Sequence, residues 1–119
     1  MVWFNAQACT FLDDGSADVQ AIVIAELPDG SGTRFEVQRS GMFDEQDRTL
    51  GMDTYCLVMD SGATHYGGVI GWQVDEANVL RLTLDDRAAT ALTTSSIEIA
   101  LRPQDADVVS RAIPELLHL

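Results

Sequence analysis

The sequence predicts an α+β fold: a single domain over residues 1–119, with a mostly antiparallel sheet of about six to seven strands, a short helix and a C-terminal helix packed on the sheet. Short apolar or alternating segments follow one another, separated by clusters of turn-forming residues. Apolar residues at helical spacing appear near the C-terminus. The chain is long enough for a self-sufficient core, and no repeat, linker or low-complexity tract divides it.

Three strands are expected in the first forty residues, joined as consecutive hairpins. The first covers 3–12 and ends at a turn cluster at 13–16. The second, 19–27, is apolar on nearly both faces, which indicates a strand covered on both sides. The third, 34–39, alternates between polar and apolar residues, so one of its faces is expected to point into the core.

Residues 40–53 interrupt this pattern and are expected to form a long loop that can hold one helical turn. Strands resume at 54–59 and 65–74. Gly67 and Gly68 lie within the second of these strands, where adjacent glycines indicate a bulge or a close approach of another backbone segment.

The C-terminal part is expected to form a strand at 79–83, a short helix capped by Asp85, a strand at 97–101 and a final helix that begins at Pro103. The apolar stripe of that helix is Ala106, Val109, Ile113, Leu116 and Leu117. Pro114 would remove a helical hydrogen bond, so a kink or a break is expected there.

Charge is the strongest compositional feature, because 7 basic residues stand against 19 acidic ones and give a net charge of −12. A field of that sign repels nucleic acid and anionic membrane, and it attracts basic proteins. Solubility alone is the alternative explanation. The chain has no lysine, which excludes Schiff-base chemistry and a P-loop.

The expected compartment follows from two further features of the sequence. No signal peptide is visible at the start, and no apolar run reaches the length of a membrane span, so we expect a cytoplasmic protein. In that reducing compartment Cys9 and Cys56 are expected to be small apolar strand residues and not a disulfide.

Motifs for catalysis or metal binding find little support. The acidic residues near position 44 do not have the spacing of a calcium loop, and the chain lacks paired histidines and a Cys-x-x-Cys, so no metal or cofactor is expected. Cys56 and His65 could approach one another across a hairpin, but a mid-strand cysteine with apolar neighbours is more typical of a core. Trp72 is likewise expected to be a core residue.

The segment FDEQDRTLGMDTYCLV, at 43–58, holds the densest group of candidate functional residues. Its acidic members are Asp44, Glu45, Asp47 and Asp53. One interpretation is that these carboxylates present charge to a basic partner. The other is that Asp47 and Asp53 hold the loop together, by accepting backbone N–H bonds or by pairing with Arg39 or Arg48.

Two tyrosines adjoin this cluster in the sequence. Tyr55 and Tyr66 are either binding hot spots, in which tyrosine is common, or ordinary members of a sheet core.

This segment also carries a family resemblance. The runs QRSGMFDEQD and LGMDTY, together with the later YGGV, resemble the tenth numbered immunity family of bacterial polymorphic toxin systems, over essentially the whole chain. The resemblance implies a small cytoplasmic protein without enzymatic activity or cofactor, which binds and neutralises a cognate toxin. It leaves open whether the shared motif contacts the toxin or forms the fold.

The expected function is therefore non-enzymatic toxin binding through Asp44, Glu45, Asp47, Asp53, Tyr55 and Tyr66. The expected partner is a toxin with a basic face, with a nuclease as one candidate, whose active surface is occluded. No nucleic acid or membrane is expected to bind, and a homodimer is left open. Two rival functions remain: a carboxylate-dependent hydrolase that uses residues 44–53, and a structural domain that self-associates through an open sheet edge.

Overall fold

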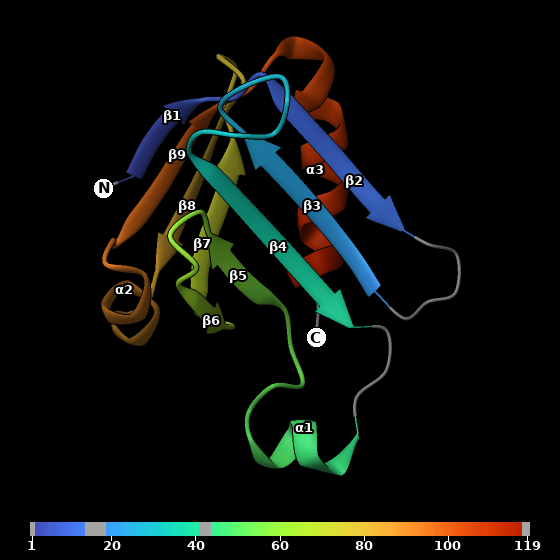
Figure 1. Ribbon diagram of the computed structural model, residues 1–119. Coiled ribbons are helices and arrows are strands. Elements are labelled where there is room, and N and C mark those ends of the chain that lie inside the picture. The colour runs from blue at the N-terminus through green and yellow to red at the C-terminus, as the bar shows by residue number, and fades with distance from the viewer. Residues whose placement is uncertain (1, 14–18, 41–43, 118–119) are drawn as a thin grey trace.

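The computed structural model describes residues 2–13, 19–40 and 44–117, and it confirms the α+β fold class (Figure 1). The described elements are β1 (Val2–Asn5), β2 (Ala8–Asp13), β3 (Val19–Ala25), β4 (Arg34–Ser40), α1 (Glu45–Thr49), β5 (Cys56–Met59), β6 (Thr64–Tyr66), β7 (Val69–Val74), β8 (Val79–Leu84), α2 (Asp86–Leu92), β9 (Ser96–Ala100) and α3 (Pro103–Leu117). Most of the turn expected at 13–16 lies outside the described residues.

The strands form two sheets, where the sequence predicted one sheet with fewer strands. Sheet A has the order β1-β9-β8-β7, and sheet B has the order β2-β3-β4-β5-β6. Only the β1–β9 pairing is parallel among the described pairs; the rest are antiparallel. The difference arises because the chain moves from one sheet to the other within two segments that were predicted as continuous strands.

The first of these crossings lies inside the predicted strand 3–12. The amide of Ala6 donates to the carbonyl of Ala100 in sheet A at 2.9 Å, whereas the amide of Gln7 donates to the carbonyl of Ala25 in sheet B at 3.0 Å. Two adjacent residues therefore belong to the hydrogen-bond networks of different sheets. Their backbone groups stay paired throughout, so no turn-forming residue is needed at the crossing.

The second crossing lies at Gly67 and Gly68, which separate β6 from β7. Both residues have positive φ, +74° and +97°. A side chain at Gly68 would place its Cβ 2.5 Å from the Cβ of Ala88 in α2. The close approach that the glycine pair predicted is confirmed, and a register irregularity between Val69 and Gly71 follows it.

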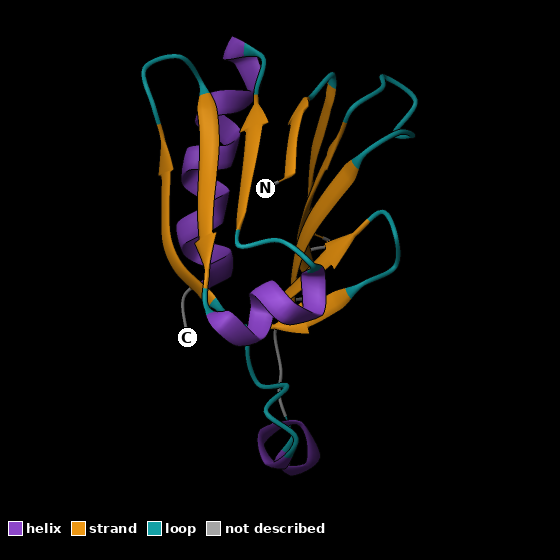
Figure 2. Cartoon of the chain, turned by 90° about the vertical axis from the view of Figure 1, so that its left-hand side faces the viewer, coloured by secondary structure: helices purple, strands orange, loops and turns teal. Residues whose placement is uncertain are grey.

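The core lies between the two sheets, and α3 covers part of the inner face of sheet B while also contacting β7 (Figure 2). Its largest fully buried side chains are Phe35, Ile22, Ile24, Leu57, Leu80, Leu82, Ile97, Ile99, Ile113, Leu116, Val37 and Val109. The predicted stripe of α3 is confirmed, since Ala106, Val109, Ile113 and Leu116 are all buried.

Expectations about three individual positions were wrong or held only in part. The expected break at Pro114 is absent, since α3 continues through this residue to its end and Ile113 beside it is buried in the core. Val19 at one end of β3 is 50% exposed, whereas Ala21 on the same face is buried, so that face is covered only in part. Trp72 is 37% exposed because β7 is an edge strand with a neighbour on one side only.

No helix in the described part of the chain combines the length and apolar character that crossing a membrane requires.

Candidate functional site

The acidic segment forms a short helix that stands apart from the two sheets (Figures 1 and 2). Asp44 caps α1 at its N-terminus and accepts a hydrogen bond from the amide of Asp47 at 2.8 Å. The carboxylate of Asp47 in turn accepts from the amide of Asp44 at 3.1 Å. This reciprocal capping box forms the helix although none of its residues is buried.

The four acidic residues are therefore not equivalent. Asp44, Glu45 and Asp53 are exposed, whereas Asp47 is partly buried. Asp47 accepts a backbone N–H bond, as one of the two sequence interpretations expected. The structure thus gives Asp44 and Asp47 a fold-forming role and leaves Glu45 and Asp53 exposed to solvent.

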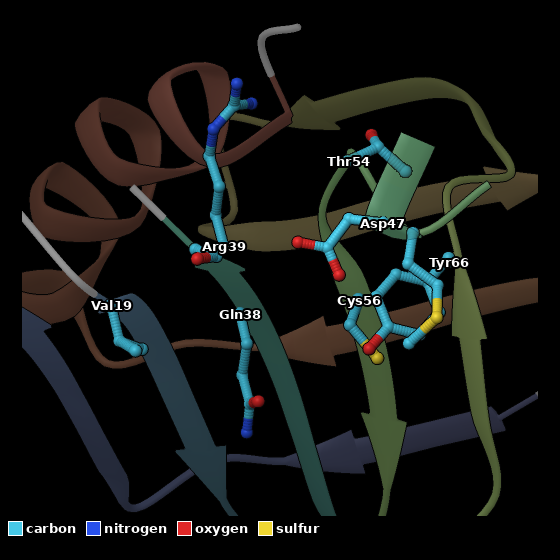
Figure 3. A pocket seen from close by; sticks show the side chains of 9 residues that line it. Val19, Gln38, Arg39, Asp47, Thr54, Cys56 and Tyr66 are labelled. Atoms are coloured by element: carbon cyan, nitrogen blue, oxygen red, sulfur yellow. The ribbon is translucent and has the colours of Figure 1, made fainter. Parts of the chain in front are cut away.

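Asp47 also lines a pocket on the outer face of sheet B (Figure 3). The strand register places Gln38 of β4 opposite Cys56 of β5, and Cys56 opposite Tyr66 of β6. These three side chains form one row across the sheet, and α1 with the segment after it closes the end of the row. The pocket has a volume of about 200 Å³ and is lined by Val19, Gln38, Arg39, Ser40, Asp47, Met52, Thr54, Cys56 and Tyr66.

The charged and polar groups around this pocket are arranged unevenly. Figure 3 shows the guanidinium of Arg39 directed away from the pocket, and it donates to the carbonyl of Leu116 in α3 at 3.3 Å. The amide nitrogen of Gln38 donates to Glu36 at 2.9 Å, which leaves the amide oxygen as an acceptor. Negative and acceptor groups therefore dominate the pocket.

Tyr66 forms one wall of the pocket and is 39% exposed. Its pKa is raised above the usual value, first by partial burial and then by the nearby Cys56 and Asp47. Asp47 and Tyr66 both line the pocket, so the two side chains belong to one local site.

Tyr55 lies in the core, in contrast to Tyr66. It is 6% exposed, and its hydroxyl oxygen accepts a hydrogen bond from the amide of Val69 at 2.9 Å. This bond ties the start of β7 to the segment before β5, so Tyr55 contributes to the fold and offers little surface to a partner.

The arrangement of side chains in and around the pocket does not favour catalysis. Cys56 pairs with Tyr66, and its neighbour Leu57 pairs with His65, so Cys56 and His65 point to opposite faces of the sheet. Burial raises the pKa of the Cys56 thiol, which disfavours the reactive thiolate. Asp47 is the one carboxylate among the described residues that line the pocket, whereas glycoside hydrolysis uses a pair.

Metal binding also lacks a site in this structure. No group of three or more His, Cys, Asp and Glu side chains within the described residues is arranged to hold an ion. The two cysteines are free, as predicted, and lie in β2 and β5.

A highly acidic α+β protein that displays an acidic helix has the charge that favours encounter with basic partner proteins. The sequence matches the family model of Immunity protein 10 over residues 5–109, and the chain belongs to this immunity protein family. Searches of curated proteins and of solved structures each find no match.

Proposed function

We propose that this chain is a non-enzymatic immunity protein that binds a cognate bacterial toxin and neutralises it by occluding the toxin's active surface. The observation that supports the proposal is the match to the Immunity protein 10 family over most of the chain. A family of this kind implies a partner protein. The physical features of this chain then indicate what kind of partner it fits.

The partner is expected to have a basic face, because the chain carries a net charge of −12. Asp44, Glu45 and Asp53 are exposed, and no residue of α1 is buried in the core. Charges displayed in this way accelerate encounter with an oppositely charged partner, and the acceleration weakens as salt increases. A nuclease toxin suits this charge, since a groove that binds phosphates is basic.

The first experiment is capture of partners by the tagged chain from its native host, followed by co-expression of each captured protein with and without the chain. A stoichiometric basic partner that is toxic alone and harmless in co-expression would support the proposal. Failure to capture or neutralise any toxin, with toxin expression verified, would refute it.

The contribution of α1 is then tested with Asp44→Asn combined with Asp47→Asn. Asparagine caps helices about as well as aspartate, and its amide oxygen can also accept the bond that Asp47 receives from the amide of Asp44. The double variant therefore changes charge and keeps the helix. It brings the net charge from −12 to −10. We expect association to slow and its salt dependence to flatten.

A matched control removes the same charge elsewhere, through Glu76→Gln with Asp107→Asn. Both positions are exposed, in the β7–β8 turn and on α3. If the control slows association as much as the α1 variant does, then the overall net charge and not α1 is responsible.

A further inference from the structure

The pocket on the outer face of sheet B offers more than an acidic surface. Cys56 and Met52 contribute apolar lining, and Tyr66 contributes an aromatic ring. The open face beside the pocket is also apolar, since Leu12 is 51% and Val19 50% exposed. A partner that docks against α1 would also contact this apolar face.

Two groups that line the pocket are hydrogen-bond acceptors. Asp47 supplies a carboxylate and Gln38 an amide oxygen. The Oγ1 of Thr54 is buried and has no hydrogen-bond partner within the described residues, although a buried hydroxyl is normally paired. The local cation, Arg39, is directed toward α3 and does not fill the pocket.

These features together match the side chain of arginine. Its guanidinium donates several hydrogen bonds in a plane, pairs with carboxylates and stacks on aromatic rings, while its methylene stem packs on apolar atoms. A hollow on the other side of β6 is less suitable, because Arg87 contributes a positive charge and Asp85 already caps α2 through the amide of Ala88 at 2.8 Å.

We infer that the pocket between α1 and the row Gln38–Cys56–Tyr66 receives one arginine side chain of the basic partner, and that this contact anchors the complex. The inference rests on the proposed function for the identity of the partner. It assigns two steps to two parts of the surface: the exposed carboxylates set the association rate, and the pocket sets the dissociation rate.

The complex with the captured toxin provides the first test. Val19→Trp places a large ring at the exposed rim of the pocket, and Asp47→Asn removes the charge inside it. Each is expected to raise the dissociation rate constant by about tenfold or more, as for loss of a central anchor. Thr83→Trp, at an exposed position on sheet A, is the control and should leave the rate unchanged.

The second test needs no toxin. N-acetyl-arginine amide is titrated into the isotope-labelled chain while the amide resonances of Gln38, Cys56 and Tyr66 are followed, with N-acetyl-citrulline amide as the neutral isostere. The arginine compound should give saturable shifts at these residues, which citrulline and the Val19→Trp variant should not show. The spectrum of the variant also reports whether it is folded.

The outcomes separate the two proposals. A neutralised toxin whose dissociation is unaffected by Val19→Trp and Asp47→Asn would overturn the arginine pocket and leave the immunity function intact. No toxin, but saturable binding of the arginine probe, would refute the immunity function and retain the pocket. No toxin and no difference between the arginine and citrulline probes would overturn both.

Discussion

Replacement of Gly68 by alanine should destabilise the protein far more than the same replacement at Gly62, a turn glycine with open space around it. Gly68 has φ +97°, and its new Cβ would lie 2.5 Å from the Cβ of Ala88, which is fully buried. The backbone conformation alone costs a non-glycine residue about 1–2 kcal/mol. The steric overlap adds about 1–3 kcal/mol, because backbone or helix must shift. We therefore expect a loss of about 2–5 kcal/mol in the free energy of unfolding.

Gly62 provides the matched control. It has φ +90°, but a Cβ there would meet no atom within 4 Å. Gly62→Ala should therefore carry the backbone cost alone, about 1–2 kcal/mol. The difference between the two variants, measured by urea unfolding with fluorescence and circular dichroism, isolates the steric contribution.

A double-mutant cycle identifies the atom responsible. Ala88→Gly removes the methyl group that the new side chain would strike. In that background, the cost of Gly68→Ala should fall toward the cost of Gly62→Ala. Equal costs for Gly68→Ala and Gly62→Ala in the native background, or an unchanged cost of Gly68→Ala after Ala88→Gly, would refute the reasoning.

Three further predictions concern the hydroxyl, carboxyl and thiol groups. Tyr55→Phe removes the acceptor of the amide of Val69 and should lower the free energy of unfolding by about 1–2 kcal/mol, seen as a reduced Tm; an unchanged Tm would contradict this. Hydrogen bonds from the amide of Val79 and other donors hold the pKa of Asp75 below its usual range. The ionised carboxylate therefore stabilises the folded state above about pH 4, and this contribution is lost as the pH falls through the lower pKa of the folded state. The stability difference between wild type and Asp75→Asn should therefore shrink from pH 6 to pH 2, and a pH-independent difference would exclude this linkage. Burial raises the pKa of Cys9 to about 11 and so lowers the fraction of reactive thiolate. Iodoacetamide at pH 8 should therefore label Cys9 about a hundredfold more slowly in the folded chain than in urea, as followed by peptide mass spectrometry. Equal labelling rates would show that the thiol is not protected.

Local features of the fold could be predicted from the sequence because each is written into a few neighbouring residues. Asp85 at the start of α2 and Pro103 at the start of α3 mark helix ends by their own chemistry. The stripe that includes Val109 and Ile113 follows helical spacing, and both residues are buried. The α+β class required no more than these local patterns.

The division into two sheets could not be predicted in this way. Ala6 and Gln7 have no turn chemistry, and their amides donate to strands of different sheets. At Gly67 and Gly68 the glycine pair indicated an irregularity, which the structure resolves as a change of sheet. Which strand pairs with which depends on long-range contacts, and alternation along one strand does not record its neighbours.

The candidate site was only partly accessible to sequence reasoning for the same reason. The acidic residues of α1 are recognisable from composition, and one helical turn was expected within 40–53, but the capping box between Asp44 and Asp47 was not predicted. The pocket depends on the register that aligns Gln38, Cys56 and Tyr66, residues far apart in the chain. Gln38 was not a candidate, and Cys56 was considered only as a thiol that could pair with His65, because no local pattern marks either residue as part of a pocket.

The pairing of β1 with β9 has a consequence for the order in which the protein can form during synthesis. The strands of sheet B are contiguous between Ala8 and Tyr66 and are joined by successive antiparallel pairings, so they can assemble as the chain emerges. β1 emerges before sheet B, yet its partner Ser96–Ala100 and the covering helix α3 emerge after it. The inner face of sheet B is therefore apolar and not covered by α3 until that helix has been made. A ribosome stalled before Pro103 would hold an aggregation-prone intermediate, and a truncated chain that ends there should require chaperones to stay in solution.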